Sequence, residues 1–335
     1  MNDPETASAP WLQQQLGLLL AQRGHAWLLH GPSGLGQYPL GLALVRAWLC
    51  DAPGAEGACG HCASCHAIDV RAHADLCVLM PEALMLALGW PLGEKEQAEI
   101  DGKKRKASRE IRIDAMRGAI EFTQRTSARG RGKAVLVYPA ERMNATTANA
   151  LLKTLEEPPG DTRFVLASHA AHALLPTLRS RCLGHAMAWP EPAAALAWLQ
   201  QQGIAPAEGA AALRAAGGRP HEALERLQSG FDGRAWGGWP RALARGDLGA
   251  MADWTPAQAV DALQKLCHDL LARSVGAAPR FFDPADLPRP AAHRIGALTD
   301  WAKALAETAR HIEHPLQPGL LLDDLVSQAR QALNS

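Results

Sequence analysis

The sequence has no hydrophobic run long enough to cross a bilayer and no excess of charge of either sign. No apolar stretch approaches the roughly 20 residues that a membrane-spanning helix needs, and residues 1–5 lack the basic start of a signal peptide. Lys plus Arg and Asp plus Glu both number 34, so the formal net charge is zero. A generally basic nucleic-acid binder is therefore not indicated, and any DNA contact should be local or shared with partners. We expect a cytoplasmic protein.

The 335 residues, 47% of them hydrophobic, are enough for two or three domains with buried cores. Four short apolar runs predict buried strands, and helical patterns lie between them. The runs are residues 26–30, 76–80, 134–138 and 163–167. One helical stripe consists of Ala148, Leu151, Leu152 and Leu155 and is closed by two prolines. Strands that alternate with helices predict a parallel sheet covered on both faces.

The composition changes after residue 188, where Ala and Leu dominate and strand-like runs disappear. The segments 217–220 (GGRP) and 236–240 (WGGWP) interrupt this part of the chain. Two apolar faces with helical spacing follow, which comprise Val260, Leu263, Cys267, Leu270 and Leu271, and Ile295, Leu298, Ala302 and Leu305. We expect a small helical domain and then a larger all-α domain. The three predicted domains are residues 1–188, 189–235 and 236–335.

Residues 94–110 have no apolar period, and they contain the basic run 103–106 (KKRK) among Gly, Ser and acidic residues. We interpret this segment as a mobile, solvated insertion. A contact with DNA phosphate or with a partner protein is the alternative.

Residues 31–38 (GPSGLGQY) follow the first predicted strand and precede a helical run, which is the position of a phosphate-binding P-loop. In the pattern G-x-x-x-x-G-K-[ST], glycines let backbone N–H groups cradle phosphate, the lysine holds the outer phosphates and the hydroxyl binds magnesium. Gly31 and Gly36 are present, but Gln37 stands in place of the lysine and Tyr38 in place of the hydroxyl residue. A neutral contact is roughly half as strong as a charge-assisted one, so Gln37 does not replace the lysine.

The carboxylate that would hold magnesium is also missing. The predicted strand at 133–137 runs into residues 138–141 (YPAE), where an active ATPase would place Asp-Glu. Glu141 lies three positions beyond the expected aspartate, and we interpret it as a surface residue at a helix start. A loop that keeps its glycines but loses lysine, hydroxyl and acid indicates an NTPase fold that no longer hydrolyses nucleotide. We expect no functional ATP binding.

Four of the seven cysteines lie close together, with the spacing C-x8-C-x2-C-x2-C. They are Cys50, Cys59, Cys62 and Cys65. Short C-x2-C turns let neighbouring sulfurs converge on one ion, and four thiolates close its coordination shell. The pattern predicts one structural zinc in a module at residues 50–65. His61, His66 and His73 are alternative ligands for one of the four positions.

A catalytic zinc of the nucleobase-deaminase type needs H-x-E upstream of its cysteines, whereas the H-x-E of this chain, residues 311–313, lies far downstream. The zinc is therefore expected to be structural. Cys77, Cys182 and Cys267 are isolated and are predicted to be small core residues.

Residues 149–159 (NALLKTLEEPP) and 178–182 (LRSRC) resemble the clamp-loader family of AAA+ proteins, which places ring-shaped clamps on DNA for bacterial replicative polymerases. The cysteine spacing, the altered P-loop and residues 113–117 (IDAMR) add to the resemblance, which is strong over residues 24–182. It implies an AAA+-type α/β domain with an inserted zinc module, a small helical lid and an all-α C-terminal collar.

The resemblance also implies partners and a role. A clamp loader is a hetero-pentamer, here with gamma/tau-type motor subunits and a delta subunit, that loads the sliding clamp onto primed DNA as part of a DNA polymerase III nucleotidyltransferase complex. A member with this altered P-loop would be a stator with no enzymatic activity by itself. Its motif Ser180, Arg181 and Cys182 would place Arg181 beside ATP on a neighbouring motor subunit. Such an arginine finger is worth about 10³ to 10⁵ in rate in GTPases.

Two other functions stay open from the sequence alone. An active AAA+ motor subunit would bind ATP tightly as a purified chain. A zinc-ribbon nucleic-acid-binding scaffold would bind DNA by itself with a steep salt dependence. The basic run 103–106 is a departure from the family core that the resemblance does not explain.

Overall fold

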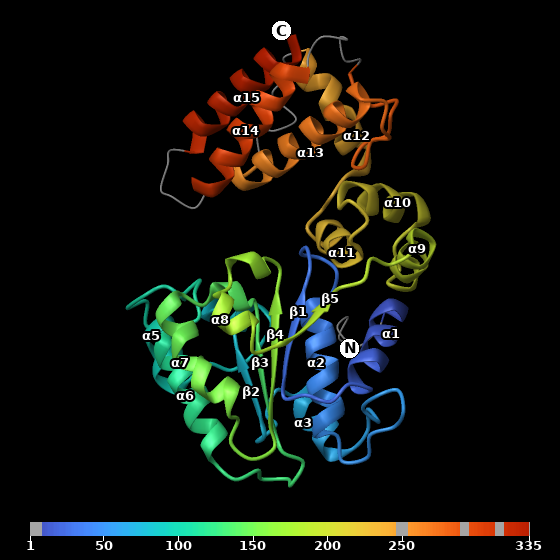
Figure 1. Ribbon diagram of the computed structural model, residues 1–335. Coiled ribbons are helices and arrows are strands. Elements are labelled where there is room, and N and C mark those ends of the chain that lie inside the picture. The colour runs from blue at the N-terminus through green and yellow to red at the C-terminus, as the bar shows by residue number, and fades with distance from the viewer. Residues whose placement is uncertain (1–8, 246–253, 289–294, 312–317, 335) are drawn as a thin grey trace. The chain divides into compact units, whose positions relative to one another are not determined.

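The computed structural model describes residues 9–245, 254–288, 295–311 and 318–334 (Figure 1). The chain divides into two compact units, Met1–Pro190 and Glu191–Ser335. The sequence features noted at residues 1–5 and 312–313 lie outside the described residues. Within the described ranges, none of the helices combines the length and the apolar character that a bilayer crossing requires.

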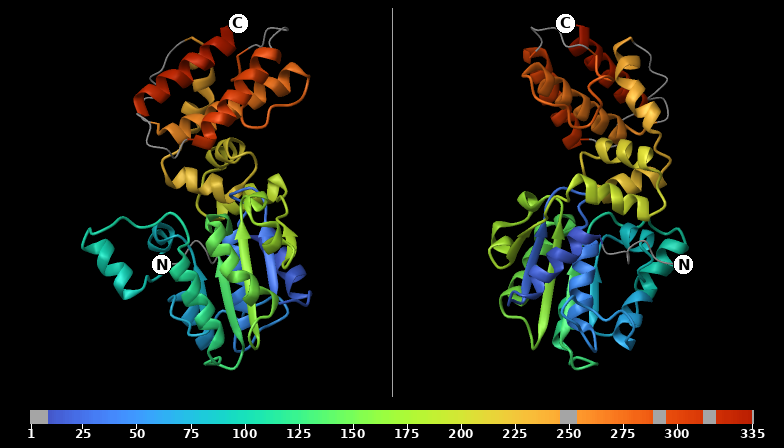
Figure 2. Two further views of the ribbon diagram at one scale, coloured as in Figure 1. Left: turned by 60° about the vertical axis from the view of Figure 1, so that its left-hand side comes forward. Right: turned by 90° about the vertical axis from the view of Figure 1, so that its right-hand side faces the viewer.

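The first unit is built on a five-stranded parallel sheet with the strand order β2-β3-β4-β1-β5 (Figure 1, Figure 2). The strands are β1 (Ala26–His30), β2 (Leu76–Leu79), β3 (Lys133–Val137), β4 (Thr162–Ser168) and β5 (Leu183–Ala186). The first four confirm the predicted parallel sheet. Strand β5 was not predicted, because it is a short, largely exposed edge strand in which Gly184 and His185 interrupt any apolar run.

Helices cover both faces of this sheet, as predicted. The helices of this unit are α1 (Pro10–Leu20), α2 (Gln37–Leu49), α3 (Ala63–Asp69), α4 (Glu82–Ala87), α5 (Glu94–Asp101), α6 (Ile113–Gln124), η1 (Ala140–Arg142), α7 (Ala145–Glu156), η2 (Ala171–Ala173) and α8 (Pro176–Arg179). On one face, Leu28, Val135 and Leu166 share a core with the apolar stripes of α6 and α7. The predicted stripe of α7 buries Leu151 and Leu155, and the helix ends at Glu156, just before the two prolines.

Helix α2 covers the other face and approaches the sheet closely. A Cβ atom at Gly41 would lie 2.9 Å from Leu136 Cδ1 and 3.3 Å from Val165 Cγ1. The helix starts directly after Gly36, whose φ of 96° lies in the left-handed region that favours glycine. The glycines of residues 31–41 therefore fix both the turn into the helix and its distance from the strands.

Residues 94–110 are solvated, as expected, but they form ordered structure, which the sequence did not suggest. The stretch Glu94–Asp101 forms α5, and Arg105 donates hydrogen bonds to Glu82 Oε1 at 2.9 Å and Glu99 Oε2 at 2.8 Å. Glu82 also accepts a hydrogen bond from the backbone N–H of Ser108 at 2.8 Å. The ordered structure was not predicted, because the ion pairs of Arg105 join residues that are 6 and 23 positions apart, which no local periodicity reports.

The described residues of the second unit contain α-helices and the loops between them, without a strand. Its helices are α9 (Pro192–Gln201), α10 (Pro206–Ala215), α11 (Pro220–Gln228), α12 (Gly233–Ala244), α13 (Pro256–Ser274), α14 (Ile295–His311) and α15 (Pro318–Asn334). A core shared by α12, α13, α14 and α15 contains the buried side chains Trp236, Trp239, Leu263, Leu298 and Leu305. Ile295 was expected on this apolar face but is 45% exposed, because it is the first residue of α14.

The segment 236–240 (WGGWP) lies inside α12 and does not interrupt the chain, contrary to expectation. Asp232 caps this helix by accepting hydrogen bonds from the N–H groups of Arg234 and Ala235. Burial of Trp236 and Trp239 outweighs the poor helix propensity of the two glycines. The expected boundary between lid and collar at residue 235 falls within α12, and the division of this unit into two domains stays a prediction.

Candidate functional site

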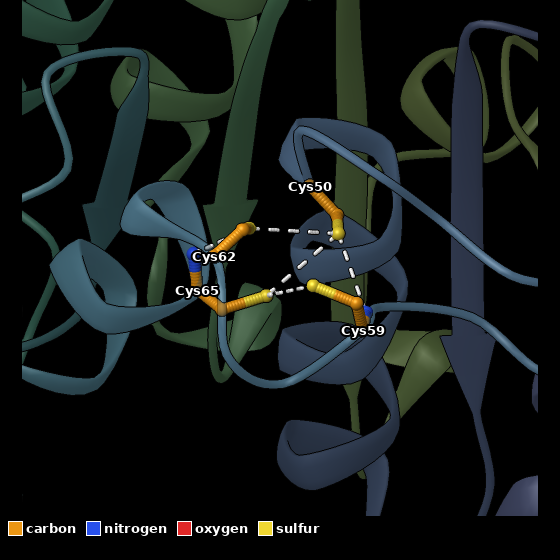
Figure 3. A group of neighbouring side chains, drawn as sticks. All are labelled: Cys50, Cys59, Cys62 and Cys65. Atoms are coloured by element: carbon orange, nitrogen blue, oxygen red, sulfur yellow. Dashed lines mark hydrogen bonds between the residues drawn. The ribbon is translucent and has the colours of Figure 1, made fainter.

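The four clustered cysteines come together at the end of α2 and the start of α3 (Figure 3). Cys50 caps the C-terminus of α2, Cys62 caps the N-terminus of α3, and Cys65 lies in the first turn of α3. Cys59 reaches the same point on the loop between them, where Gly57 and Gly60 have φ angles of 119° and 81°.

The four sulfur atoms lie within 4.8 Å of one another. The separations from Cys50 to Cys62, from Cys50 to Cys65 and from Cys59 to Cys65 are 3.7, 3.8 and 4.0 Å. Sulfurs at about 2.3 Å from a tetrahedral zinc would be about 3.8 Å apart, so the geometry fits one four-coordinate ion. The histidine alternatives are not part of this group, since His61 Nδ1 hydrogen-bonds the carbonyl oxygen of Cys59 and His73 Nδ1 accepts from the N–H of Asp75.

The local electrostatics of the cysteines differ from one sulfur to the next. Burial opposes ionisation of Cys62, but the backbone N–H of Cys65 and other donors outweigh it and lower the pKa of Cys62 to about 6. Burial raises the pKa of Cys65 to about 12 and also raises the pKa of Cys50. A cation at the centre of the four sulfurs would offset this cost of burying thiolates, which makes the group suited to a metal ion.

The remaining cysteines behave as core residues, as predicted. Cys267 is 1% exposed and packs in the core of the second unit. Cys77 and Cys182 are partly buried against the core formed with α6 and α7. Burial raises the pKa of each of the three thiols to about 12.

The loop at residues 31–36 lies between β1 and α2, where the P-loop pattern placed it. Gln37 is 1% exposed, and its side-chain amide donates hydrogen bonds to the carbonyl oxygens of Gly31 at 2.8 Å and Pro32 at 2.7 Å. The Gln37 side chain thus folds back onto the loop that precedes it. In this conformation its amide is bonded to the loop backbone and is not directed at a ligand.

Tyr38 belongs to an aromatic group at the carboxyl ends of the strands. Its hydroxyl accepts a hydrogen bond of 2.7 Å from Trp90 Nε1, and its ring stacks on Tyr138 with centroids 5.2 Å apart. Tyr138 in turn lies edge-on to His169 at 5.3 Å. Tyr138 and His169 directly follow β3 and β4, so aromatic rings without a carboxylate stand where a P-loop enzyme would place the ligands of its magnesium ion.

Glu141 is not the exposed residue that we expected. It lies in the short helix η1 with its side chain only 14% exposed, and its Oε1 accepts a hydrogen bond of 3.0 Å from the backbone N–H of His169. The expectation was wrong because the chain after β3 turns back toward the residues that follow β4. Glu141 thereby links these two connections.

Arg181 follows α8, whose C-terminus is capped by Ser180. All of its hydrogen bonds to described residues go to Glu156 and Thr177: Nε and Nη2 donate to Glu156 Oε2 at 3.1 and 2.8 Å, and Nη1 donates to the carbonyl oxygen of Thr177 at 2.8 Å. Cys182 Sγ lies 3.5 Å from the carbonyl oxygen of Leu178, so the end of α8 orders this motif.

The residues that partner the predicted site were not identified as such from the sequence. Glu156 lies 25 positions from Arg181, and Trp90 lies 52 positions from Tyr38. Glu156 stands in the motif 149–159, but nothing in that motif indicates which arginine it contacts. Trp90 carries no local signal, because a single Trp after a short helix is equally typical of ordinary packing.

Comparison with known proteins agrees with this arrangement. The family model "DNA polymerase III, delta subunit" matches residues 14–188. DNA polymerase III subunit delta' of Pseudomonas aeruginosa is 39% identical over 221 residues, which are 65% of this chain and 56% of that protein. The Yersinia pestis delta' subunit is 31% identical over 92% of this chain and 89% of its own length. DNA polymerase III subunit tau of Escherichia coli is 30% identical over 50% of this chain and 22% of its length.

The match to the Pseudomonas aeruginosa protein thus spans little more than half of that relative, whereas the match to the Yersinia pestis protein runs through both units. The parallel sheet, the four-cysteine cluster and the loop at residues 31–36 all fall within the region that the family model covers. The chain belongs to the family of DNA polymerase III delta-prime subunits, and its first unit is an α/β domain built on a five-stranded parallel sheet.

Proposed function

We propose that this chain is the stator of a bacterial clamp loader, a subunit that hydrolyses no ATP itself and helps to load the sliding clamp onto primed DNA. The observation that carries the proposal is the state of the phosphate loop. Gln37 is hydrogen-bonded to the carbonyl oxygens of Gly31 and Pro32, and Tyr38 is stacked on Tyr138. A triphosphate with magnesium would have to displace both side chains and would find no lysine, hydroxyl or aspartate in return.

In the proposed role Arg181 acts on a nucleotide bound by a neighbouring subunit. Arg181 is partly exposed, with 30% of its side chain accessible, and among the described residues its guanidinium is held by Thr177 and by the exposed carboxylate of Glu156. Such a surface ion pair is worth about 0 to 1 kcal/mol, so a phosphate can replace the carboxylate at little cost. An arginine finger supplied in this way stabilises the charge that spreads over the transferring phosphoryl group.

The partners in this proposal are gamma/tau-type motor subunits and a delta subunit, and the complex as a whole contacts the clamp and DNA. The identity with tau over half of this chain supports shared AAA+ architecture between stator and motor. The chain would work in the cytoplasm, where bacterial DNA is replicated. Its second unit would supply a lid at residues 189–235 and a collar at 236–335 that joins the pentamer.

The metal in the cysteine cluster is proposed to be zinc, with Cys50, Cys59, Cys62 and Cys65 as its ligands. Four thiolates leave no open position for substrate or water, so the ion would hold α2 to α3 and take no part in a reaction. The backbone N–H groups of Cys59 and Cys65 donate hydrogen bonds to the sulfurs of Cys50 and Cys62. These hydrogen bonds favour the thiolate form of the two accepting cysteines.

Nucleotide binding by the isolated full-length chain tests the proposal directly. Equilibrium titration with a fluorescent ATP analogue in the presence of magnesium should show no binding at micromolar concentration. The matched positive control is a gamma/tau-type motor subunit under the same conditions. Saturable micromolar binding of magnesium-ATP by the lone chain would contradict the stator assignment and favour an active motor.

A further inference from the structure

An open hollow of about 940 Å³ lies at the amino ends of β1 and β4. This is the edge of the sheet opposite to the loop at residues 31–36, which follows the carboxyl end of β1. Four segments contribute to the walls: the connection from α1 to β1, the turn at residues 53–57 of the cysteine module, residues 130–131 before β3, and residues 161–163 at the start of β4. The hollow is thus separate from the altered P-loop and from Arg181.

The charged side chains that line the hollow are three arginines and one aspartate: Arg23, Arg131, Arg163 and Asp161. Within the part of the chain that the structure describes, none of the three arginines forms an ion pair with a carboxylate. Nearby Arg129 differs, since its Nη2 lies 3.3 Å from Asp51 Oδ2. Positive charge therefore exceeds negative charge around this concavity, where Asp161 is the one carboxylate among the lining residues.

The guanidinium of Arg163 is fixed by an aromatic ring. It lies over the indole of Trp48, 5.4 Å from the ring centroid, and Trp48 packs against Trp27 with centroids 4.9 Å apart. Stacking on an aromatic face orients a guanidinium and leaves its N–H groups free to bind an anion. Trp27 also lines the hollow, and its buried indole N–H has no hydrogen-bond partner among the described residues.

The wall contributed by the cysteine module is a constrained turn. Gly54 and Gly57 exchange backbone hydrogen bonds of 2.8 and 3.2 Å, and Gln13 of α1 donates to the carbonyl oxygen of Glu56 at 3.1 Å. Gly57 packs closely on Leu16, because a Cβ there would lie 3.1 Å from Leu16 Cδ2. This wall of the hollow is thus formed by ordered backbone.

We propose that this hollow binds a ligand with at least two phosphate groups, through Arg23, Arg131 and Arg163. A guanidinium matches the geometry of phosphate with two parallel hydrogen bonds, and three of them around one concavity can hold more than one phosphate. The volume lies at the upper end of the roughly 300 to 1,000 Å³ typical of small-molecule sites, which is ample for a nucleotide. The same chemistry would accept the backbone of a nucleic-acid strand, and the experiment separates these two sources.

The test is calorimetric titration of the full-length, metal-loaded chain at low salt with inorganic pyrophosphate and, separately, with a short single-stranded DNA oligonucleotide. We expect at least one probe to bind with one site per chain, and we expect Arg163→Gln or Arg131→Gln to weaken that binding about tenfold or more. Binding of both probes in mutual competition would indicate a nucleotide-sized ligand. Binding of the oligonucleotide without competition by pyrophosphate would indicate a nucleic-acid strand.

The matched control is Arg117→Gln, an exposed arginine on α6 that does not line the hollow and that should leave both affinities unchanged. Since Arg163 packs on Trp48, the variant Arg163→Lys and thermal unfolding of each variant distinguish lost binding from lost folding. Arg131→Gln provides a second variant without aromatic packing. The proposal is overturned if neither probe binds the wild-type chain, or if folded Arg163→Gln and Arg131→Gln bind as the wild type does.

Discussion

Arg181 donates two hydrogen bonds to a single carboxylate oxygen, Oε2 of Glu156, at 3.1 and 2.8 Å. The two residues belong to the two motifs by which the sequence resembles clamp loaders, and α7 and α8 bring them together. A third hydrogen bond, to the carbonyl oxygen of Thr177, orients the guanidinium from the other side. The arginine is therefore ordered in the free chain by contacts that a phosphate group can replace.

The first prediction concerns this arginine. Replacing it by Arg181→Ala should lower ATP hydrolysis at the adjoining motor site by about a thousandfold, because the charge of the transition state loses its external cation. Steady-state ATPase assays of the reconstituted complex on primed DNA measure the loss. Arg179→Ala, an exposed neighbour on α8, is the control and should retain full turnover. Intact assembly by size-exclusion chromatography with unchanged turnover would remove the arginine-finger role.

The second prediction concerns the phosphate loop. Gln37→Lys should not create an ATPase, because Tyr38 still lacks a magnesium-binding hydroxyl and no aspartate follows β3. The substitution should lower the free energy of unfolding by about 2 kcal/mol or more, since it replaces a neutral amide that is hydrogen-bonded to Gly31 and Pro32 by a buried charged amine. Hydrolysis assays and chemical unfolding of the purified chain measure both effects, with the exposed Gln124→Lys as control. Hydrolysis above background by Gln37→Lys would refute this account.

The third prediction concerns the cysteine cluster. Metal analysis of the purified chain should find about one zinc per chain. Cys59→Ser should lose most of that metal and lower the free energy of unfolding by about 4 kcal/mol or more, because a structural ion that links α2 and α3 is removed. Cys77→Ser lies outside the cluster and should keep the metal. Full metal content in Cys59→Ser would show that the ligand set is wrong.

The fourth prediction concerns pH. Burial, next to the ring of Trp198 at 5.0 Å, lowers the pKa of His221 to about 4 from its usual 6.5. Because the unfolded chain binds this proton more readily, the free energy of unfolding should fall as pH drops from about 6.5 to 4, by up to about 3 kcal/mol from this group.

Chemical unfolding of wild type and His221→Gln between these pH values gives the slope of the free energy of unfolding against pH for each protein. The difference between the two slopes reports His221, because any effect of metal release is common to both proteins. The variant should lose less stability on acidification than the wild type. His172→Gln, which replaces an exposed histidine, should keep the wild-type slope. Equal slopes for His221→Gln and the wild type would contradict the prediction.

Much of the first unit could be predicted because its signals are local. The strand at Ala26–His30 and the helix at Ala145–Glu156 carry continuous apolar patterns, and the cysteine spacing confines four sulfurs to 16 consecutive residues, 50–65. The exposed edge strand β5 carries no such pattern, and α12 forms against its own composition because two tryptophans are buried. The ordered structure of residues 94–110 was not predicted, because Arg105 binds Glu82, which lies 23 positions away along the chain.

The sequence by itself determined which chemical groups are present: two loop glycines without a lysine, four thiols at metal spacing, and an arginine in a family motif. Only the tertiary structure decided what these groups contact, because the partners lie far away along the chain. Packing brings Trp90 to Tyr38, Glu156 to Arg181, and three arginines around one hollow. A short-range pattern specifies an element and its exposed face, whereas hydrogen bonds across 25 or 52 residues exist only once the sheet has set the distances between the elements.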